Sequence, residues 1–131
     1  MLIDKSKIKL CDFGISKMLD MDEHVDDIES PFNINKQTKT IGTVPWMSPE
    51  FINDKIFTPK SDVYSFGILL WELFTRSKLY PDLQPIQIAY GVANNNLRPP
   101  IPTNMDKNIA TLITMCWNED PEKRPTFKEI I

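Results

Sequence analysis

Few side chains in this sequence are of the types that most often bind metals or act as nucleophiles. There are two cysteines, Cys11 and Cys116, and one histidine, His24. Their separations match no zinc-ligand spacing, so we expect no Cys/His metal site. Two cysteines this far apart, each in an apolar neighbourhood, also do not form a disulfide framework. This favours a reducing, intracellular environment.

Four short motifs carry the remaining candidates for chemistry. Asp12-Phe13-Gly14 comes first and directly follows a predicted strand. Alone it is a weak signal, because composition produces it by chance in roughly one chain in fifty of this length, and it equally describes a turn at the end of a strand. The other three are Gly42-Thr43-Val44-Pro45-Trp46-Met47 followed by Ser48-Pro49-Glu50, then Lys60-Ser61-Asp62-Val63-Tyr64-Ser65-Phe66-Gly67, and finally Cys116-Trp117 with Asp120-Pro121 and Arg124-Pro125.

In this order and spacing, the four motifs resemble the protein kinase family. The resemblance covers Leu2 to Ile131. It implies a mainly α fold, that of the C-terminal lobe of a kinase domain: a short β-hairpin, a long activation loop and then about four helices. Residues 1–131 would form a partial kinase domain, incomplete at both ends, with residues 12–50 as its activation segment.

The resemblance implies a role for each residue of the first motif. Asp12 corresponds to the acid that holds Mg²⁺ on the phosphates of ATP, and a carboxylate suits that hard cation. Phe13 corresponds to the aromatic residue whose packing differs between active and inactive states. Gly14 gives backbone freedom at the start of the activation loop. ATP and Mg²⁺ are therefore the cofactors expected of a complete domain, with weak binding or none by this chain alone.

Further residues have implied roles in structure and in substrate positioning. Glu50 resembles the glutamate that pairs with a distant arginine, here Arg124, whose guanidinium can grip a buried carboxylate at two places. Asp62 resembles an acid that accepts hydrogen bonds from the catalytic-loop backbone. An ordinary helix-start acid is the alternative, because that loop is absent from this chain. Thr43 and Trp46 lie in the segment that positions the substrate.

The type of substrate is indicated by a mixture of signals. Gly42-Thr43 is typical of serine/threonine kinases, whereas Trp46-Met47 and Cys116-Trp117 look like tyrosine kinases. The mixture resembles the tyrosine-kinase-like group, whose members mostly phosphorylate serine and threonine. The activation loop also offers candidate phosphorylation sites, for each of which an ordinary polar loop residue is the alternative. These candidates are Ser30, Thr38 and Thr40.

Several parts that a kinase needs are missing from the sequence. Catalysis requires a Gly-rich loop, a strand lysine paired with a helix glutamate, and a catalytic-loop aspartate as base. The sequence contains no Gly-x-Gly-x-x-Gly and no His-Arg-Asp. We expect the base upstream of Met1 and no measurable kinase activity from this chain alone. The alternatives to part of an active kinase are a noncatalytic, pseudokinase-like binding or regulatory half-domain and a non-functional remnant.

Hydrophobic periodicity predicts the elements that position these motifs. Alternation of Ile8 and Leu10 with lysines predicts a hairpin within Leu2–Leu10. Residues 12–50 lack periodicity and carry six acids between positions 20 and 29, which predicts a long polar loop. Helices are predicted from Ser61, as the N-cap, to Phe74, then over residues 84–93 and 107–117, and from Thr126 onward.

The helix Asp62–Phe74 also suggests partners. It is apolar on nearly all sides, so the complete domain is expected to cover it all round. In this chain one face would be exposed, which predicts low solubility and either self-association or binding to the missing N-terminal half. Protein substrate and ATP are the other expected partners. A net charge of −3 gives no case for nucleic acid, and no apolar run suits a membrane span, so we expect a cytoplasmic protein.

Overall fold

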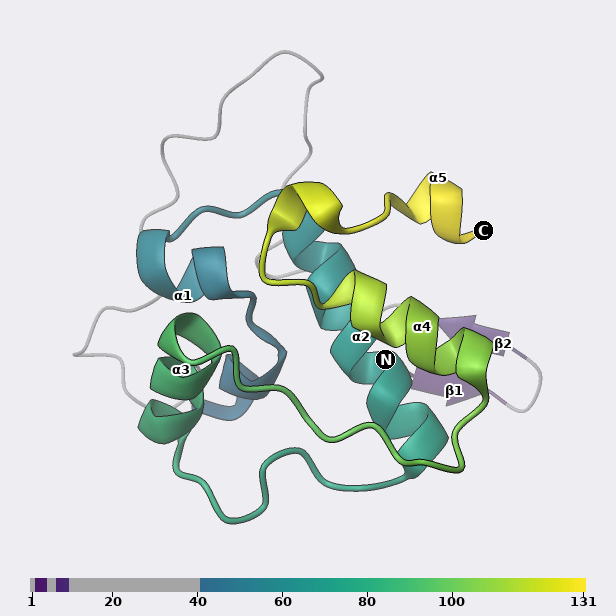
Figure 1. Cartoon of the computed structure of the whole chain (residues 1–131), viewed down its shortest axis with the longest axis horizontal. Coiled ribbons are helices and arrows are strands. Elements are labelled where there is room, and N and C mark those ends of the chain that lie inside the picture. Colours follow the sequence, from purple (N-terminus) through teal and green to yellow (C-terminus); the bar gives the residue numbers. More distant parts are fainter. Residues whose placement is uncertain (1, 5–6, 10–40) are drawn as a thin grey trace.

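The computed structural model describes residues 2–4, 7–9 and 41–131. Two strands, β1 and β2, pair antiparallel with Ile3 opposite Ile8. The remaining elements are helical, which confirms the expected mainly α fold (Figure 1). In chain order the elements are β1 (Leu2–Asp4), β2 (Lys7–Lys9), the 3-10 helix η1 (Ile41–Trp46), α1 (Pro49–Asp54), α2 (Pro59–Thr75), α3 (Pro85–Asn94), α4 (Lys107–Cys116), the 3-10 helix η2 (Pro121–Lys123) and α5 (Phe127–Ile130).

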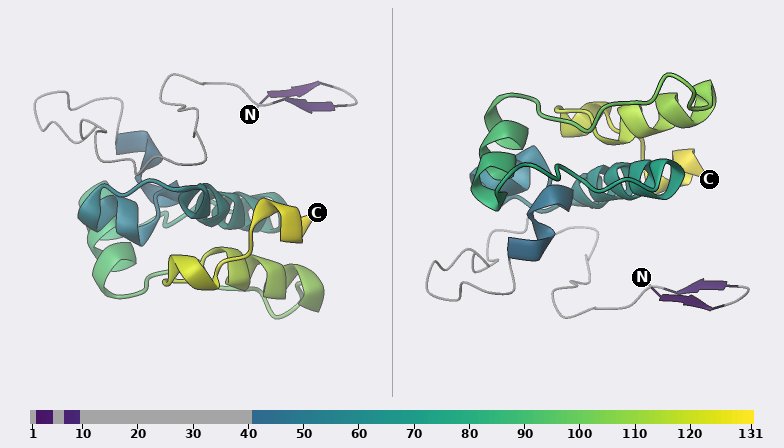
Figure 2. Two further views of the ribbon diagram at one scale, coloured as in Figure 1. Left: turned by 90° about the horizontal axis from the view of Figure 1, so that it is seen from above. Right: turned by 90° about the horizontal axis from the view of Figure 1, so that it is seen from below.

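Helix α2 is the central element of the helical part. It packs against η1, α4 and η2, and α2 and α4 lie side by side in all three views (Figures 1 and 2). Its fully buried residues include Tyr64 and Ile68, which share the core with Ile113 of α4. Gly67 makes this close packing possible, because a Cβ built there would lie 2.7 Å from the Cβ of Cys116. The contact between α2 and α4 therefore depends on the absence of a side chain at this position.

The start of α2 differs from the sequence-based expectation. Ser61 was expected to be the N-cap, and this is wrong: the helix begins at Pro59 and its N-cap is Thr58. Thr58 has extended backbone, and its side chain accepts a hydrogen bond from the Lys60 amide at 3.2 Å. Ser61 is the third helical residue, and its hydroxyl accepts from the Thr58 amide at 3.1 Å. Proline fits the first helical position because that amide has no partner within the helix, which moves the start upstream.

Helix α1 and the 3-10 helix η1 were not predicted as helices. Residues 41–46 fall inside the stretch expected to be loop, and α1 begins at Pro49 within the same stretch. Both are short, so neither gives a periodic pattern long enough to recognise. They are held by tertiary contacts, because α3 packs on both η1 and α1.

The later helices agree with the prediction. Helices α3 and α4 begin and end within one residue of the expected bounds. Thr126 caps α5 as expected, and its side chain hydrogen-bonds with Glu129. Among the described residues, no helix is both long and apolar enough to cross a bilayer.

We predict that Gly67→Ala destabilises the protein. The added Cβ meets the Cβ of Cys116 and lies 3.3 Å from the Trp117 amide nitrogen, and neither atom is the end of a flexible chain. Overpacking of about 1–3 kcal/mol then exceeds the gain of about 1 kcal/mol in helix propensity. Urea denaturation measures the difference.

Gly91→Ala is the matched control, since Gly91 is also inside a helix. The Cβ added there meets chiefly the end of the Leu97 side chain at 2.7 Å, which can turn away. An equal or smaller loss of stability at Gly67 than at Gly91 would contradict the proposed role of the close contact between α2 and α4.

Candidate functional site

A buried ion pair joins Glu50, in the first turn of α1, to Arg124, which follows η2. Arg124 Nη1 lies 2.8 Å from Glu50 Oε1, and Nη2 lies 2.9 Å from Oε2. The Arg124 side chain is fully buried, and the Glu50 side chain is 12% exposed. This two-point contact is the geometry in which a guanidinium binds a carboxylate most strongly. The structure thus brings together the two residues that the sequence paired.

The remaining donors of Arg124 are also satisfied. Its Nε donates to the carbonyl of Asn118 at 2.8 Å, and Nη1 donates to the carbonyl of Lys60 at 3.0 Å. Lys60 Nζ in turn donates to the carbonyl of Arg124. Arg124 Cζ also lies 5.1 Å from the ring centre of Tyr64. A buried cation is costly unless it is paired and hydrogen-bonded throughout, and this one is.

Ser61 extends the network to the start of α2. Its hydroxyl donates to Glu50 Oε1 at 2.9 Å while accepting from the Thr58 amide. Burial alone would raise the pKa of the Glu50 carboxyl, but hydrogen bonds from Arg124 and the backbone, with the charge of Arg124, outweigh it and lower the pKa. Glu50 therefore stays ionised. We name Glu50, Ser61 and Arg124 the ion-pair network.

Trp46 lies at the end of η1 and is held by α2. Its indole Nε1 donates to Glu72 Oε2 at 2.8 Å, and the hydroxyl of Ser65 donates to its carbonyl at 2.7 Å. These two contacts fix the segment containing Trp46 on the surface of α2. Thr43 lies in η1, and its side chain is outside what the structure describes.

Asp62 is exposed near the start of α2. Within the described part of the chain, its carboxylate has no hydrogen-bond or ion-pair partner. Partial burial raises the pKa of this carboxyl. An acid that is partly desolvated and lacks a partner is poised to accept hydrogen bonds from another segment.

Several expected site residues lie outside the described residues, so their predicted roles stay predictions. They are Asp12, Phe13, Gly14, Ser30, Thr38 and Thr40. Cys11 and His24 lie outside as well. Among the described residues, no group of three or more His, Cys, Asp or Glu side chains is arranged to hold a metal ion.

Sequence reasoning missed the part that Ser61 plays in the ion-pair network and the contact of Tyr64 with it. Tyr64 is fully buried, and the guanidinium carbons of Arg98 and Arg124 lie 5.0 and 5.1 Å from its ring centre. Cationic guanidinium groups are attracted to aromatic rings at such distances. Both residues sit beside Asp62 in the third motif, so their position was visible, but the partners that give them a role come from distant segments.

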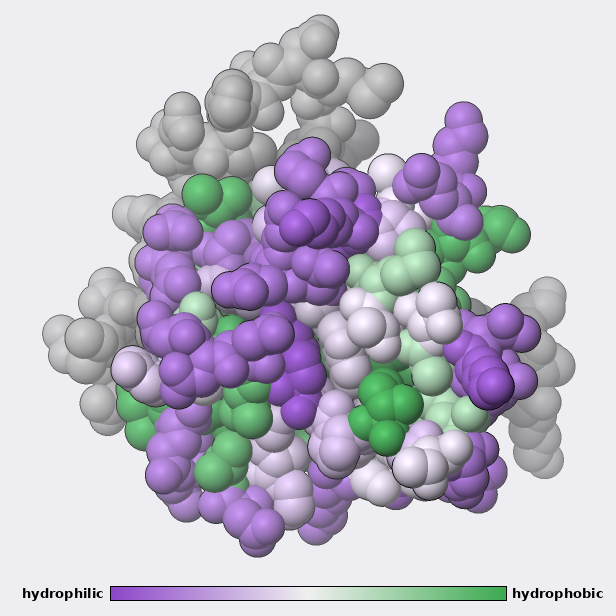
Figure 3. Space-filling model, viewed as in Figure 1, coloured by the Kyte–Doolittle hydropathy of each residue, from purple (hydrophilic) through white to green (hydrophobic). Residues whose placement is uncertain are grey.

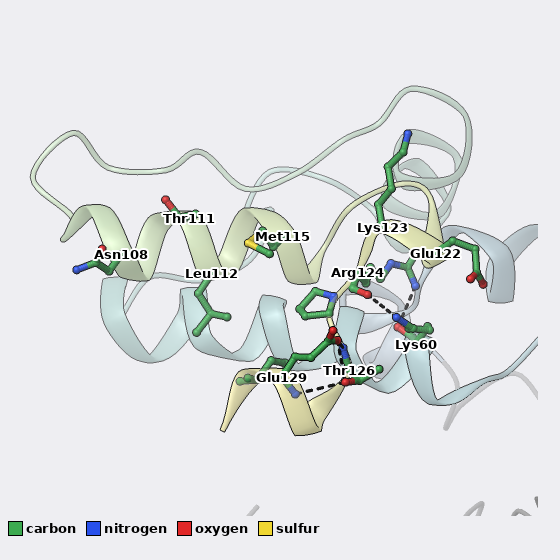
Figure 4. Close-up of a pocket in the computed structure, with 12 residues that line it drawn as sticks. Lys60, Asn108, Thr111, Leu112, Met115, Glu122, Lys123, Arg124, Thr126 and Glu129 are labelled. Atoms are coloured by element: carbon green, nitrogen blue, oxygen red, sulfur yellow. Dashed lines mark hydrogen bonds between the residues drawn. The ribbon is translucent and has the colours of Figure 1, made fainter.

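A cavity of about 660 Å³ lies beside the ion-pair network, bounded by α4, α5 and the start of α2. Figure 4 shows Leu112 directed toward α5, with Thr126 and Glu129 opposite. Thr126 Oγ1 donates to Glu129 Oε2 at 2.8 Å, and Thr111 Oγ1 donates to the carbonyl of Lys107 at 2.8 Å. These polar groups already have hydrogen-bond partners within their own helices. The cavity is therefore not assigned a binding or catalytic role.

Comparison with known proteins identifies this arrangement. The family described as protein tyrosine and serine/threonine kinase matches residues 1–131. A probable serine/threonine-protein kinase of Dictyostelium discoideum is 40% identical over 131 residues, covering 100% of this chain and 13% of that protein. A serine/threonine/tyrosine-protein kinase of Arabidopsis thaliana is 39% identical over 131 residues, covering 100% of this chain and 30% of that protein. A mitogen-activated protein kinase kinase kinase of Drosophila melanogaster is 36% identical over 129 residues, covering 98% of this chain and 10% of that protein.

The chain therefore belongs to the protein tyrosine and serine/threonine kinase family. Its helical fold corresponds to the C-terminal lobe of the kinase domain, as the resemblance implied. The chain spans less than a third of the length of each of these three relatives.

We predict that Arg124→Met strongly destabilises the protein. The variant leaves the Glu50 carboxylate buried without its cation, which costs about 3–5 kcal/mol. Lys123→Met is the matched control, because the Lys123 side chain is 70% exposed and its contact with Asp120 is 3.6 Å long. Its effect is expected within about 0.5 kcal/mol. Denaturant unfolding compares the two, and equal losses would contradict a special role for Arg124.

The lowered pKa of Glu50 also predicts a pH dependence. A carboxyl whose pKa is lower in the folded state stabilises the fold fully above its unfolded pKa, about 4.5. This contribution is lost as pH falls through the folded pKa. The difference in free energy of unfolding between the parent chain and Glu50→Gln is therefore expected to shrink below about pH 4. A difference that stays constant from neutral to strongly acid pH would refute the assignment.

Proposed function

We propose that this chain is part of a serine/threonine protein kinase that transfers the γ-phosphoryl group of ATP to protein hydroxyl groups. The match of the kinase family to residues 1–131 carries this proposal. In the reaction, the bond between the γ-phosphorus and the bridging oxygen of ATP breaks. A bond to the substrate hydroxyl oxygen forms, ADP leaves, and the hydroxyl proton passes to a base. The names of two relatives specify a serine/threonine kinase and a serine/threonine/tyrosine kinase. The mixed motifs of this chain favour the serine/threonine type.

Asp12 is the residue of this chain proposed to hold Mg²⁺. Its carboxylate has the donor chemistry that Mg²⁺ prefers, and the ion supplies charge stabilisation on the phosphates when bound. Phe13 and Gly14 would form the hinge of the activation segment, residues 12–50. Ser30, Thr38 and Thr40 are proposed phosphorylation sites within this segment. A phosphate there would add negative charge able to order the segment against basic groups.

Trp46 and Thr43 are proposed to position the protein substrate. The hydrogen bond from Trp46 to Glu72 and the contact of Ser65 with the Trp46 carbonyl support this role. They attach the end of the activation segment to α2, the most extensively packed helix. Asp62, with its unpartnered carboxylate, is proposed to hold the backbone of a catalytic loop from outside this chain. The proposed use of ATP and the free thiol of Cys116 favour a cytoplasmic protein.

A noncatalytic binding or regulatory role is the second candidate. Leu73 and Phe74, at the end of α2, are 46% and 56% exposed. The face of the molecule in Figure 3 carries separate apolar patches among polar residues. Exposed large apolar side chains at the end of a core helix favour association with another protein surface.

We predict that the 131-residue chain alone has no measurable kinase activity. It contains neither the positioned base nor the lysine and Gly-rich loop that hold ATP, and a missing base alone costs roughly 10²–10⁴ in rate. Transfer of labelled phosphate from ATP to a general protein substrate measures this, with Asp12→Ala as the control. Transfer by the parent chain that disappears in Asp12→Ala would contradict the prediction.

We also predict that the chain self-associates through the end of α2. Replacing Leu73 and Phe74 together by glutamine is expected to lower the weight-average mass in sedimentation velocity, because it removes the exposed apolar surface. Ile86→Gln is the matched control, since Ile86 is 76% exposed on a different helix. A parent chain that sediments as a monomer would contradict the prediction, as would an Ile86→Gln effect as large as that of the α2 variant.

A further inference from the structure

A second cavity, of about 580 Å³, lies away from the ion-pair network. It is bounded by the end of α2, the connection from α2 to α3, and residues 97–102. Its size is within the range of pockets that bind small molecules. The walls are largely apolar and include Trp71, Leu83, Leu97, Pro100, Ile101 and Pro102.

Arg98 lines this cavity, and one of its nitrogen atoms has no partner. Its Nε donates to the carbonyl of Trp117 at 3.0 Å, and its Nη1 donates to the carbonyl of Leu97 at 2.8 Å. Its Nη2 is buried and has no hydrogen-bond partner. Among the described residues, no carboxylate pairs with Arg98. This differs from the fully buried Arg124, since Arg98 is half-buried, but a buried donor atom without an acceptor is still unfavourable.

Tyr80 lines the same cavity and also has a polar atom without a hydrogen-bond partner. Its hydroxyl is buried without a partner. Burial raises the pKa of this phenol, so it stays protonated and remains a donor. Its backbone φ is 44°, in the left-handed region, which is strained for a residue with a side chain. Such strain is often found where a segment is shaped to bind a ligand.

We propose that this cavity binds a carboxylate carried on an apolar group. The unpaired donors of Arg98 and Tyr80 would bind the carboxylate oxygens, and the apolar walls would bury the rest of the ligand. Both residues line the cavity, but both donor atoms are buried, so binding requires the two side chains to turn toward the ligand. The exposed Lys78 and Asp82 also line the cavity, and with Arg98 they leave one net positive charge.

Phenylacetate and phenylacetamide test this proposal in the 131-residue chain, with binding measured by NMR titration. The acid is expected to bind at least about tenfold more tightly than the amide, because a hydrogen bond to a charged group is stronger than one to a neutral group. Tyr80→Phe is expected to weaken phenylacetate binding by about tenfold. The same variant should not lower the melting temperature, since it removes a buried hydroxyl that has no partner.

A second pair of probes distinguishes a free small acid from the end of a protein chain. An acetylated dipeptide ending in phenylalanine is titrated with a free and with an amidated C-terminus. If the dipeptide with the free C-terminus binds more tightly than phenylacetate, the site is assigned to a protein C-terminus. If phenylacetate binds more tightly, the site is assigned to a free small acid. The proposal is overturned if neither acid binds, if the amides bind as tightly as the acids, or if Tyr80→Phe leaves the affinity unchanged.

Discussion

The buried guanidinium of Arg124 is the constraint on which the described fold depends. A cation removed from water must have an anion and a full set of acceptors. Glu50 supplies the anion from 74 residues away, and the carbonyls of Lys60 and Asn118 supply further acceptors. These groups belong to α1, α2 and the turn after α4. One side chain therefore fixes three segments that are distant in the sequence, and Ser61 ties the same carboxylate to the start of α2.

The ion-pair network lies beside residues to which the proposed kinase role assigns a function. Glu50 lies in the first turn of α1, shortly after the segment that contains Trp46, and Trp46 is itself hydrogen-bonded to Glu72 of α2. The end of the proposed activation segment is thus attached to the core at two points. Asp62 differs from these residues because its carboxylate has no partner in the described part of the chain. The carboxylate of Asp62, on the central helix α2, is therefore the group proposed to hold a segment from elsewhere in a kinase.

Much of the fold was predictable from sequence, because α3, α4 and the body of α2 have helical apolar spacing with caps or prolines at their starts. The family resemblance also paired Glu50 with Arg124. Local pattern did not predict α1, which has six residues and depends on packing against α3. It misplaced the cap of α2, because Ser61 and Thr58 are both good caps and only Pro59 decides between them. The unpaired donors of Arg98 and Tyr80 were beyond prediction, because they depend on which tertiary partners are absent.

A double-mutant cycle on Glu50 and Arg124 tests the central claim most directly. The free energy of unfolding would be measured for the parent chain, Glu50→Gln, Arg124→Met and the double variant. If the pair organises the fold, the double variant loses far less stability than the sum of the single losses, with a coupling energy of about 2 kcal/mol or more. If the two single losses add within about 0.5 kcal/mol, the residues act independently and the account is wrong.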